Sequence, residues 1–179
     1  MNPGARDATV PVDTKPYKID RPLYFGEKSK HWQNGGVAFL ENDPRPGFFS
    51  YGRIYKITNE QFDDVVLQEN GLMPGTTDQK IPRPDPGFSS VVFESIYGRI
   101  ICLENFEGSP VYTFTRPTDI PPGKRYRPSN EYLGTIIAGL VETVPNISQD
   151  EIVSYFSKTE AKELGPGGIK NLLKNLERE

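Results

Sequence analysis

Residues 49–70 read FSYGRIYKITNEQFDDVVLQEN, and within them a strand pattern changes directly into a helix pattern. Aromatic or apolar residues recur at alternate positions from Phe49 to Ile57, which predicts a strand with an aromatic face. Thr58 and Gln61 have the spacing of a capping box, so we expect a helix to begin here and to end before the following glycine.

Further strands and helices are expected on both sides of this segment. Strands are predicted at Gly35–Leu40, 91–104 and Ser109–Thr115, with a turn at Glu107-Gly108. Helices are predicted over 129–144, from Ser148 and from Gly168, each with apolar residues at helical spacing. Strands that mostly precede helices, without βαβ alternation, predict the α+β class with a largely antiparallel sheet or barrel flanked by helices.

Composition narrows the classes of function. The chain has 179 residues, 35% of them hydrophobic, and a net charge of −3, which fits a globular protein. Basic residues do not cluster with aromatic ones, so we expect no nucleic-acid partner. No apolar run approaches the roughly 18 residues of a membrane span, and no signal-peptide pattern opens the chain, so we expect a cytoplasmic protein. A single cysteine excludes an internal disulfide and a cysteine-based zinc site.

The first twenty residues are polar and interrupted by prolines, which predicts an arm that lies on the domain instead of a core element. We therefore divide the chain into an arm at 1–20, a domain at 21–160 and a helical tail at 161–179. The arm also carries apolar residues, and it is expected to cover an otherwise unpaired strand edge. A second chain that covers this edge would make a homodimer, and this alternative is left open.

Glu69 is the strongest candidate for chemistry. Phe62 and Val65 are expected on the buried face of the helix, and Glu69 lies seven and four residues after them. Burial and the negative end of the helix dipole would both raise the pKa of this carboxyl group. A carboxylate poised nearer neutrality suits proton transfer, whereas a frayed last turn would instead place Glu69 in solvent.

Other reactive residues are interpreted as structural. His31 is the only histidine and is expected to be a surface or packing residue, without a metal site. Cys102 lies in an apolar strand and is expected to be a buried thiol. Asp63 and Asp64 are assigned to a solvated helix face.

Four short motifs occur in an order that resembles the gamma-glutamyl cyclotransferase-like family. Residues 23–40, with Ser29, Trp32 and the glycine pair before Val-Ala-Phe, resemble the family's stretch in which a Trp-Gly-Gly run enters the strand before the catalytic helix. Residues 52–58 resemble its Gly-x-Leu-Tyr-x-Leu strand. Residues 62–71 are similar to the end of its catalytic helix, with a longer spacing. Residues 127–139 are similar to its Pro-Ser-x-x-Tyr helix start.

The resemblance implies a small barrel that converts a gamma-glutamyl amine or peptide into 5-oxoproline and a free amine, without metal or cofactor. By this resemblance Glu69 takes a proton from the substrate's own amine, and Tyr97 and Tyr132 orient the substrate. Ser129 and the pair Gly35-Gly36 are the remaining expected substrate-binding residues. Without the resemblance, the two tyrosines would be assigned to core packing.

One family feature is absent from the sequence. The family's first strand leads into a Tyr-Gly-Ser-Asn loop that holds the substrate, and this chain has no such motif. Two functions therefore stay open: a cyclotransferase that acts through Glu69, and a non-catalytic relative that binds a small ligand or a protein partner.

Overall fold

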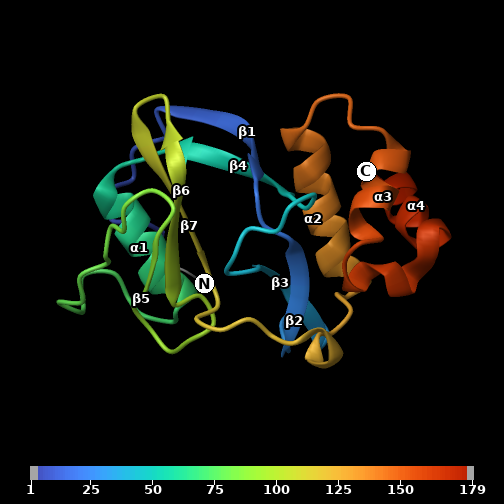
Figure 1. The fold of residues 1–179 in the computed structure, drawn as a ribbon, viewed down its shortest axis with the longest axis horizontal. Helices are drawn as coiled ribbons and strands as arrows, with labels where there is room; N and C mark the ends of the chain where they lie inside the picture. Colours follow the sequence, from blue (N-terminus) through green and yellow to red (C-terminus); the bar gives the residue numbers. More distant parts are fainter. Residues whose placement is uncertain (1–3, 177–179) are drawn as a thin grey trace. The chain divides into compact units, whose positions relative to one another are not determined.

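The computed structural model describes residues 4–176, and these residues form an α+β fold with antiparallel sheets, as predicted. In chain order the elements are β1 Asp13–Ile19, β2 Leu23–Ser29, β3 Gly35–Leu40, β4 Ser50–Lys56, α1 Asn59–Glu69, β5 Ser89–Val91, β6 Arg99–Phe106, β7 Ser109–Thr115, η1 Pro122–Lys124, α2 Asn130–Thr143, α3 Gln149–Phe156, η2 Glu160–Leu164 and α4 Gly165–Leu176. Figure 1 shows their course along the chain.

The chain forms two compact units, each built from two separate stretches of sequence. The α1 unit comprises the described part of residues 1–19 together with Arg53–Asp119. The α2 unit comprises Asp20–Gly52 and Ile120–Glu179, as far as the structure describes them. Each unit buries its own group of apolar side chains.

The α1 unit contains the three-stranded antiparallel sheet β5-β6-β7. The predicted turn at Glu107-Gly108 is confirmed, and both residues have positive φ, at 50° and 78°, as a two-residue hairpin loop requires. The single strand predicted over 91–104 is wrong, because the chain loops between β5 and β6. The amide of Val92 donates to the carbonyl of Gly98 at 2.7 Å, and a Cβ at Gly98 would lie 1.8 Å from the Phe93 carbonyl oxygen. Only glycine fits this close approach.

Strand β1 forms within the N-terminal arm and pairs with β4. None of its seven residues is buried, which agrees with an arm that lies on the domain. Pro16 is accommodated because β1 pairs on one side only, and an edge strand needs no donor there.

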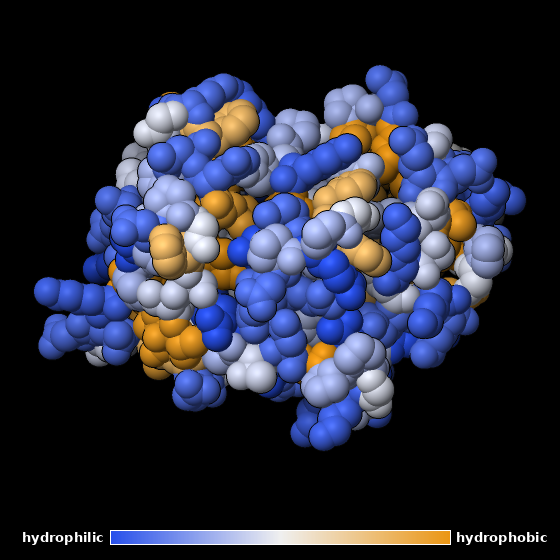
Figure 2. Space-filling view, in the orientation of Figure 1, coloured by the Kyte–Doolittle hydropathy of each residue, from blue (hydrophilic) through white to orange (hydrophobic). Residues whose placement is uncertain are grey.

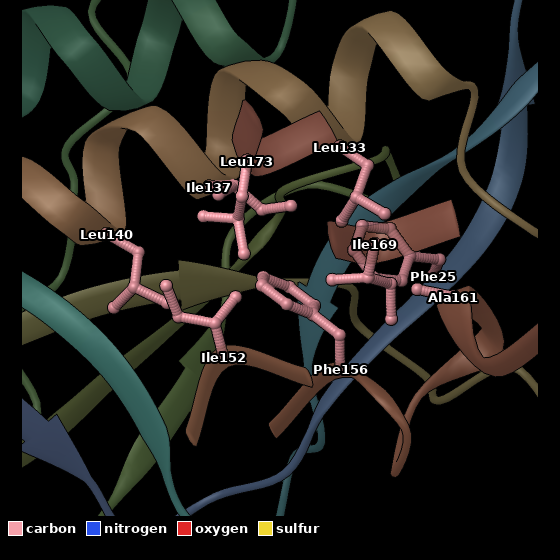
Figure 3. Close-up of a cluster of buried hydrophobic side chains, with 9 residues drawn as sticks. All are labelled: Phe25, Leu133, Ile137, Leu140, Ile152, Phe156, Ala161, Ile169 and Leu173. Carbon is pink, nitrogen blue, oxygen red and sulfur yellow. The ribbon is translucent and has the colours of Figure 1, made fainter. Parts of the chain in front are cut away.

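The α2 unit joins the β2-β3 hairpin to α2, α3 and α4. The predicted caps are confirmed: Ser129 caps α2, and Ser148 forms a capping box with Glu151 at the start of α3. Helix α4 begins at Gly165, three residues before its predicted start. In Figure 3, side chains on one face of α2, such as Ile137, point toward Phe156 of α3, and both residues are fully buried.

The strands of residues 4–176 form three separate sheets, and none of these sheets closes into a barrel. No helix in the described part of the chain is both long and apolar enough to cross a membrane. Polar residues cover most of the face in Figure 2, with hydrophobic residues in smaller patches between them.

Candidate functional site

Helix α1 positions the main candidate residue, Glu69, in its last turn. The predicted capping box is present: the Gln61 amide donates to the Thr58 hydroxyl at 3.2 Å, and the Thr58 amide donates to the Gln61 side chain at 2.9 Å. The helix ends at Asn70 and is followed by Gly71 with a φ of 75°. Val66 and Leu67 pack in the buried cluster of the α1 unit, and this packing determines which side of α1 faces inward.

The expected burial of Glu69 is wrong, because its side chain is exposed. The buried face of α1 runs through Gln61, Asp64, Val66 and Leu67 instead of through Val65. Val65 is 39% exposed, and a residue four positions later lies on the same side of a helix. The sequence pattern was misread because three apolar residues in a row, 65–67, leave the direction of the apolar face ambiguous.

The expected rise in the pKa of Glu69 is confirmed. The cause is desolvation: neighbouring parts of the chain remove some of the water that would stabilise the carboxylate. The side chain is therefore open to a ligand and is also a stronger base than an ordinary glutamate. Both properties suit a residue that exchanges protons with a bound molecule.

Asn70 connects the end of α1 to the segment that carries Tyr97. Its side-chain amide donates to the carbonyl oxygens of Val66 at 2.8 Å and of Tyr97 at 3.1 Å. Its side-chain oxygen accepts from the Ser95 hydroxyl and from the Tyr97 amide, the latter at 3.3 Å. The backbone of Tyr97 is thus fixed at the residue that follows Glu69. This role of Asn70 was not predicted from the sequence, although an asparagine just before a glycine is a common helix end.

The four other predicted site residues gather in the α2 unit. A Cβ at Gly35 would lie 2.3 Å from the Ser129 backbone nitrogen, and the Gly36 amide donates to the Arg127 carbonyl at 2.9 Å. Ser129 accepts from the Tyr132 amide at 3.2 Å, which caps α2. These contacts bring the start of β3 against the start of α2.

Tyr132 is half-buried, and it lies against the backbone of β3 and the ring of Trp32. Its hydroxyl oxygen accepts from the Ala38 amide at 3.2 Å, and its ring centroid lies 4.8 Å from that of Trp32. Packing therefore accounts for its position in the α2 unit. Glu69 and Tyr97 belong to the α1 unit, so the expectation that Tyr132 lies beside Glu69 stays a prediction.

The residues interpreted as structural have mixed outcomes. His31 is exposed against Trp32 and Cys102 is fully buried, as predicted, and burial raises the pKa of the Cys102 thiol. The assignment of Asp64 to a solvated face is wrong, because its side chain is fully buried beneath Arg6. Within residues 4–176, no group of three or more histidine, cysteine or acidic side chains is placed to hold a metal ion.

The chain is similar to a known plant protein. The chain is 31% identical over 181 residues to the protein named histone deacetylase 5 from Arabidopsis thaliana. The match covers 90% of this chain but 26% of that protein, so the chain spans about a quarter of the relative's length. No protein-family model matches the chain, and no solved structure matches it.

Proposed function

We propose that the chain is a gamma-glutamyl cyclotransferase-like enzyme that releases 5-oxoproline and a free amine from a gamma-glutamyl amine or peptide. The observation that carries this proposal is Glu69, an accessible carboxyl group whose pKa desolvation raises. The ordered run of family-like motifs over residues 23–156 supports it. The described strands form three separate sheets and not the closed barrel that the resemblance implies.

The proposed reaction is an intramolecular acyl transfer. Glu69 accepts a proton from the substrate's α-amino group, and the amine nitrogen then attacks the γ-carbonyl carbon. A new C–N bond closes the five-membered ring, and the original amide C–N bond breaks. The leaving amine takes the proton back from Glu69, so no oxidant, reductant or water is consumed. Because the attack is intramolecular, the protein mainly holds a reactive conformer and moves one proton.

The proposed substrate contacts use the tyrosines and the glycine pair. In this proposal the hydroxyl groups of Tyr97 and Tyr132 orient the substrate and stabilise the negative charge that develops on the carbonyl oxygen. Gly35, Gly36 and Ser129 are the remaining proposed substrate-binding residues. Tyr97 is the best supported of these residues, because Asn70 fixes its backbone at the end of the helix that carries Glu69.

The second candidate function is a non-catalytic module that binds a small ligand or a protein partner. Two observations favour it: the Glu69 side chain is exposed, contrary to the expectation for a buried catalytic base, and the chain matches about a quarter of a longer protein. The name of the relative belongs to that whole protein, so its activity is not carried over to this chain.

The proposal is tested with a panel of gamma-glutamyl amines and dipeptides. Purified protein is incubated with each compound, and 5-oxoproline is measured by mass spectrometry. Turnover of at least one compound supports the cyclotransferase. Binding of a panel member without 5-oxoproline release supports the non-catalytic module instead.

A further inference from the structure

The N-terminal arm is held on α1 by a series of polar contacts. None of residues 4–12 is buried. Four residues of α1 and its cap hold Gly4–Thr9: Thr58, Gln61, Asp64 and Gln68. Their spacing of three to four residues places them along one side of the helix. The arm runs along this side in the opposite direction to the helix. Further along the arm, the Val12 amide donates to the Lys56 carbonyl of β4 at 2.9 Å.

Two glutamines of α1 bind the backbone of the arm. The Gln68 side chain accepts from the Gly4 amide at 3.3 Å and donates to the Gly4 carbonyl at 3.0 Å. The Gln61 side chain donates to the carbonyl oxygens of Asp7 at 3.1 Å and of Thr9 at 2.6 Å. Such contacts recognise an extended peptide whatever its side chains are.

Asp64 of α1 binds the guanidinium group of Arg6 in the arm. Both oxygens of Asp64 accept from the guanidinium group of Arg6, at 2.8 to 3.1 Å, and Asp64 also accepts from the Arg6 amide at 2.7 Å. Asp64 is fully buried beneath the arm, while Arg6 stays about half exposed. A second carboxylate, Glu60, lies 3.3 Å from Arg6. The face of α1 therefore matches a planar cation at this one position.

We propose that this side of α1 is a recognition site for an extended arginine-containing peptide, and that Gly4–Thr9 is its detachable occupant within the same chain. The contacts bind the backbone along the segment and select arginine at the position of Arg6. Val10 and Val12, which follow this segment, are 83% and 82% exposed, so burial of their side chains does not hold the segment in the site. This inference concerns peptide binding, and it holds whether or not the proposed reaction occurs.

The test uses the full chain with a specific protease site in place of Val10–Val12. The folded protein is cleaved there, and a fluorescent peptide of residues 1–9 is then added. We expect the labelled peptide to replace the cleaved arm with saturable one-to-one binding. Unlabelled peptides serve as matched competitors. The Arg6→Ala peptide should compete at least about tenfold more weakly than the native one, and Arg6→Lys should lie between them, because it keeps the charge without the bidentate fork.

Three results would overturn the proposal. Equal competition by the native and Arg6→Ala peptides would show that Asp64 does not select arginine. Failure of the labelled peptide to bind, with the native circular dichroism spectrum retained, would show that no separable site exists. Loss of that spectrum on cleavage would show that the arm is an inseparable part of the fold.

Discussion

At the scale of single residues, Gly35 and Gly139 provide a matched pair for testing the packing of the α2 unit. A Cβ at Gly35 would lie 2.3 Å from the backbone of Ser129, whereas a Cβ at Gly139 would lie in open space on α2. Gly35→Ala should lower the free energy of unfolding by about 1–3 kcal/mol, because the backbone cannot yield as a flexible side chain can. Gly139→Ala should raise it by about 0.5–1 kcal/mol, because alanine favours a helix. Urea denaturation measures both, and equal effects would contradict the close packing of β3 on α2.

Two residues of α1, Glu69 and Asp64, differ in burial from the sequence prediction. Glu69 was predicted to be buried because Val65 was placed on the inner face of α1, and the structure exposes both. Asp64 was predicted to be solvated, yet Arg6, which is 58 residues earlier, covers it. A partner so distant in sequence leaves no local signal. The pKa of Glu69 is raised as predicted, and its cause is desolvation, one of the two causes expected from the sequence.

Among the elements, helix α3 begins with a capping box whose contribution to stability can be measured. Ser148 accepts from the Glu151 amide at 3.2 Å, and the Glu151 side chain accepts from the Ser148 amide at 2.9 Å. Ser148→Ala should lower the free energy of unfolding by about 1 kcal/mol, because it leaves a helix amide without its acceptor. Ser154→Ala, at an exposed position of the same helix, is the control and should be neutral or slightly stabilising. No difference between the two variants in denaturation would contradict the cap.

Elements with their own start signals were predictable. The helices at α1, α2 and α3 begin where Thr58, Ser129 and Ser148 cap them, and the β6-β7 turn lies at Glu107-Gly108 as expected. The loop between β5 and β6 was not predictable, because its closure depends on Gly98 lying against Phe93. The pairing of β1 with β4 is a long-range contact of the same kind.

At the scale of the whole molecule, the arm predicts an acid-dependent loss of stability. Hydrogen bonds from Arg6 lower the pKa of Asp64, and those from Thr9 and Thr58 lower the pKa of Asp7. Groups with a lowered pKa stabilise the folded protein above their unfolded value, here 3.8, and this contribution is lost as the pH falls through the folded value. The melting temperature should therefore drop most steeply below about pH 4. Arg6→Ala should lower the melting temperature at pH 7 and weaken the dependence of the melting temperature on pH below about pH 4. An unchanged pH dependence would contradict the Asp64 contact.

We propose that Glu69 transfers the proton in gamma-glutamyl cyclisation. The most direct test of this role is to measure 5-oxoproline release by the Glu69→Gln variant. With the best substrate of the panel, we predict turnover by the native protein and by the control Glu163→Gln, which alters an exposed glutamate of the α2 unit. The native rate should fall as the pH drops through the pKa of Glu69, above its ordinary 4.5, because the base must be deprotonated. Glu69→Gln should lose at least about a hundredfold in rate and melt at an equal or higher temperature, since a desolvated charge is removed. Undiminished 5-oxoproline release by Glu69→Gln would exclude Glu69 as the base. No release by the native protein with any compound of the panel would exclude the proposed reaction.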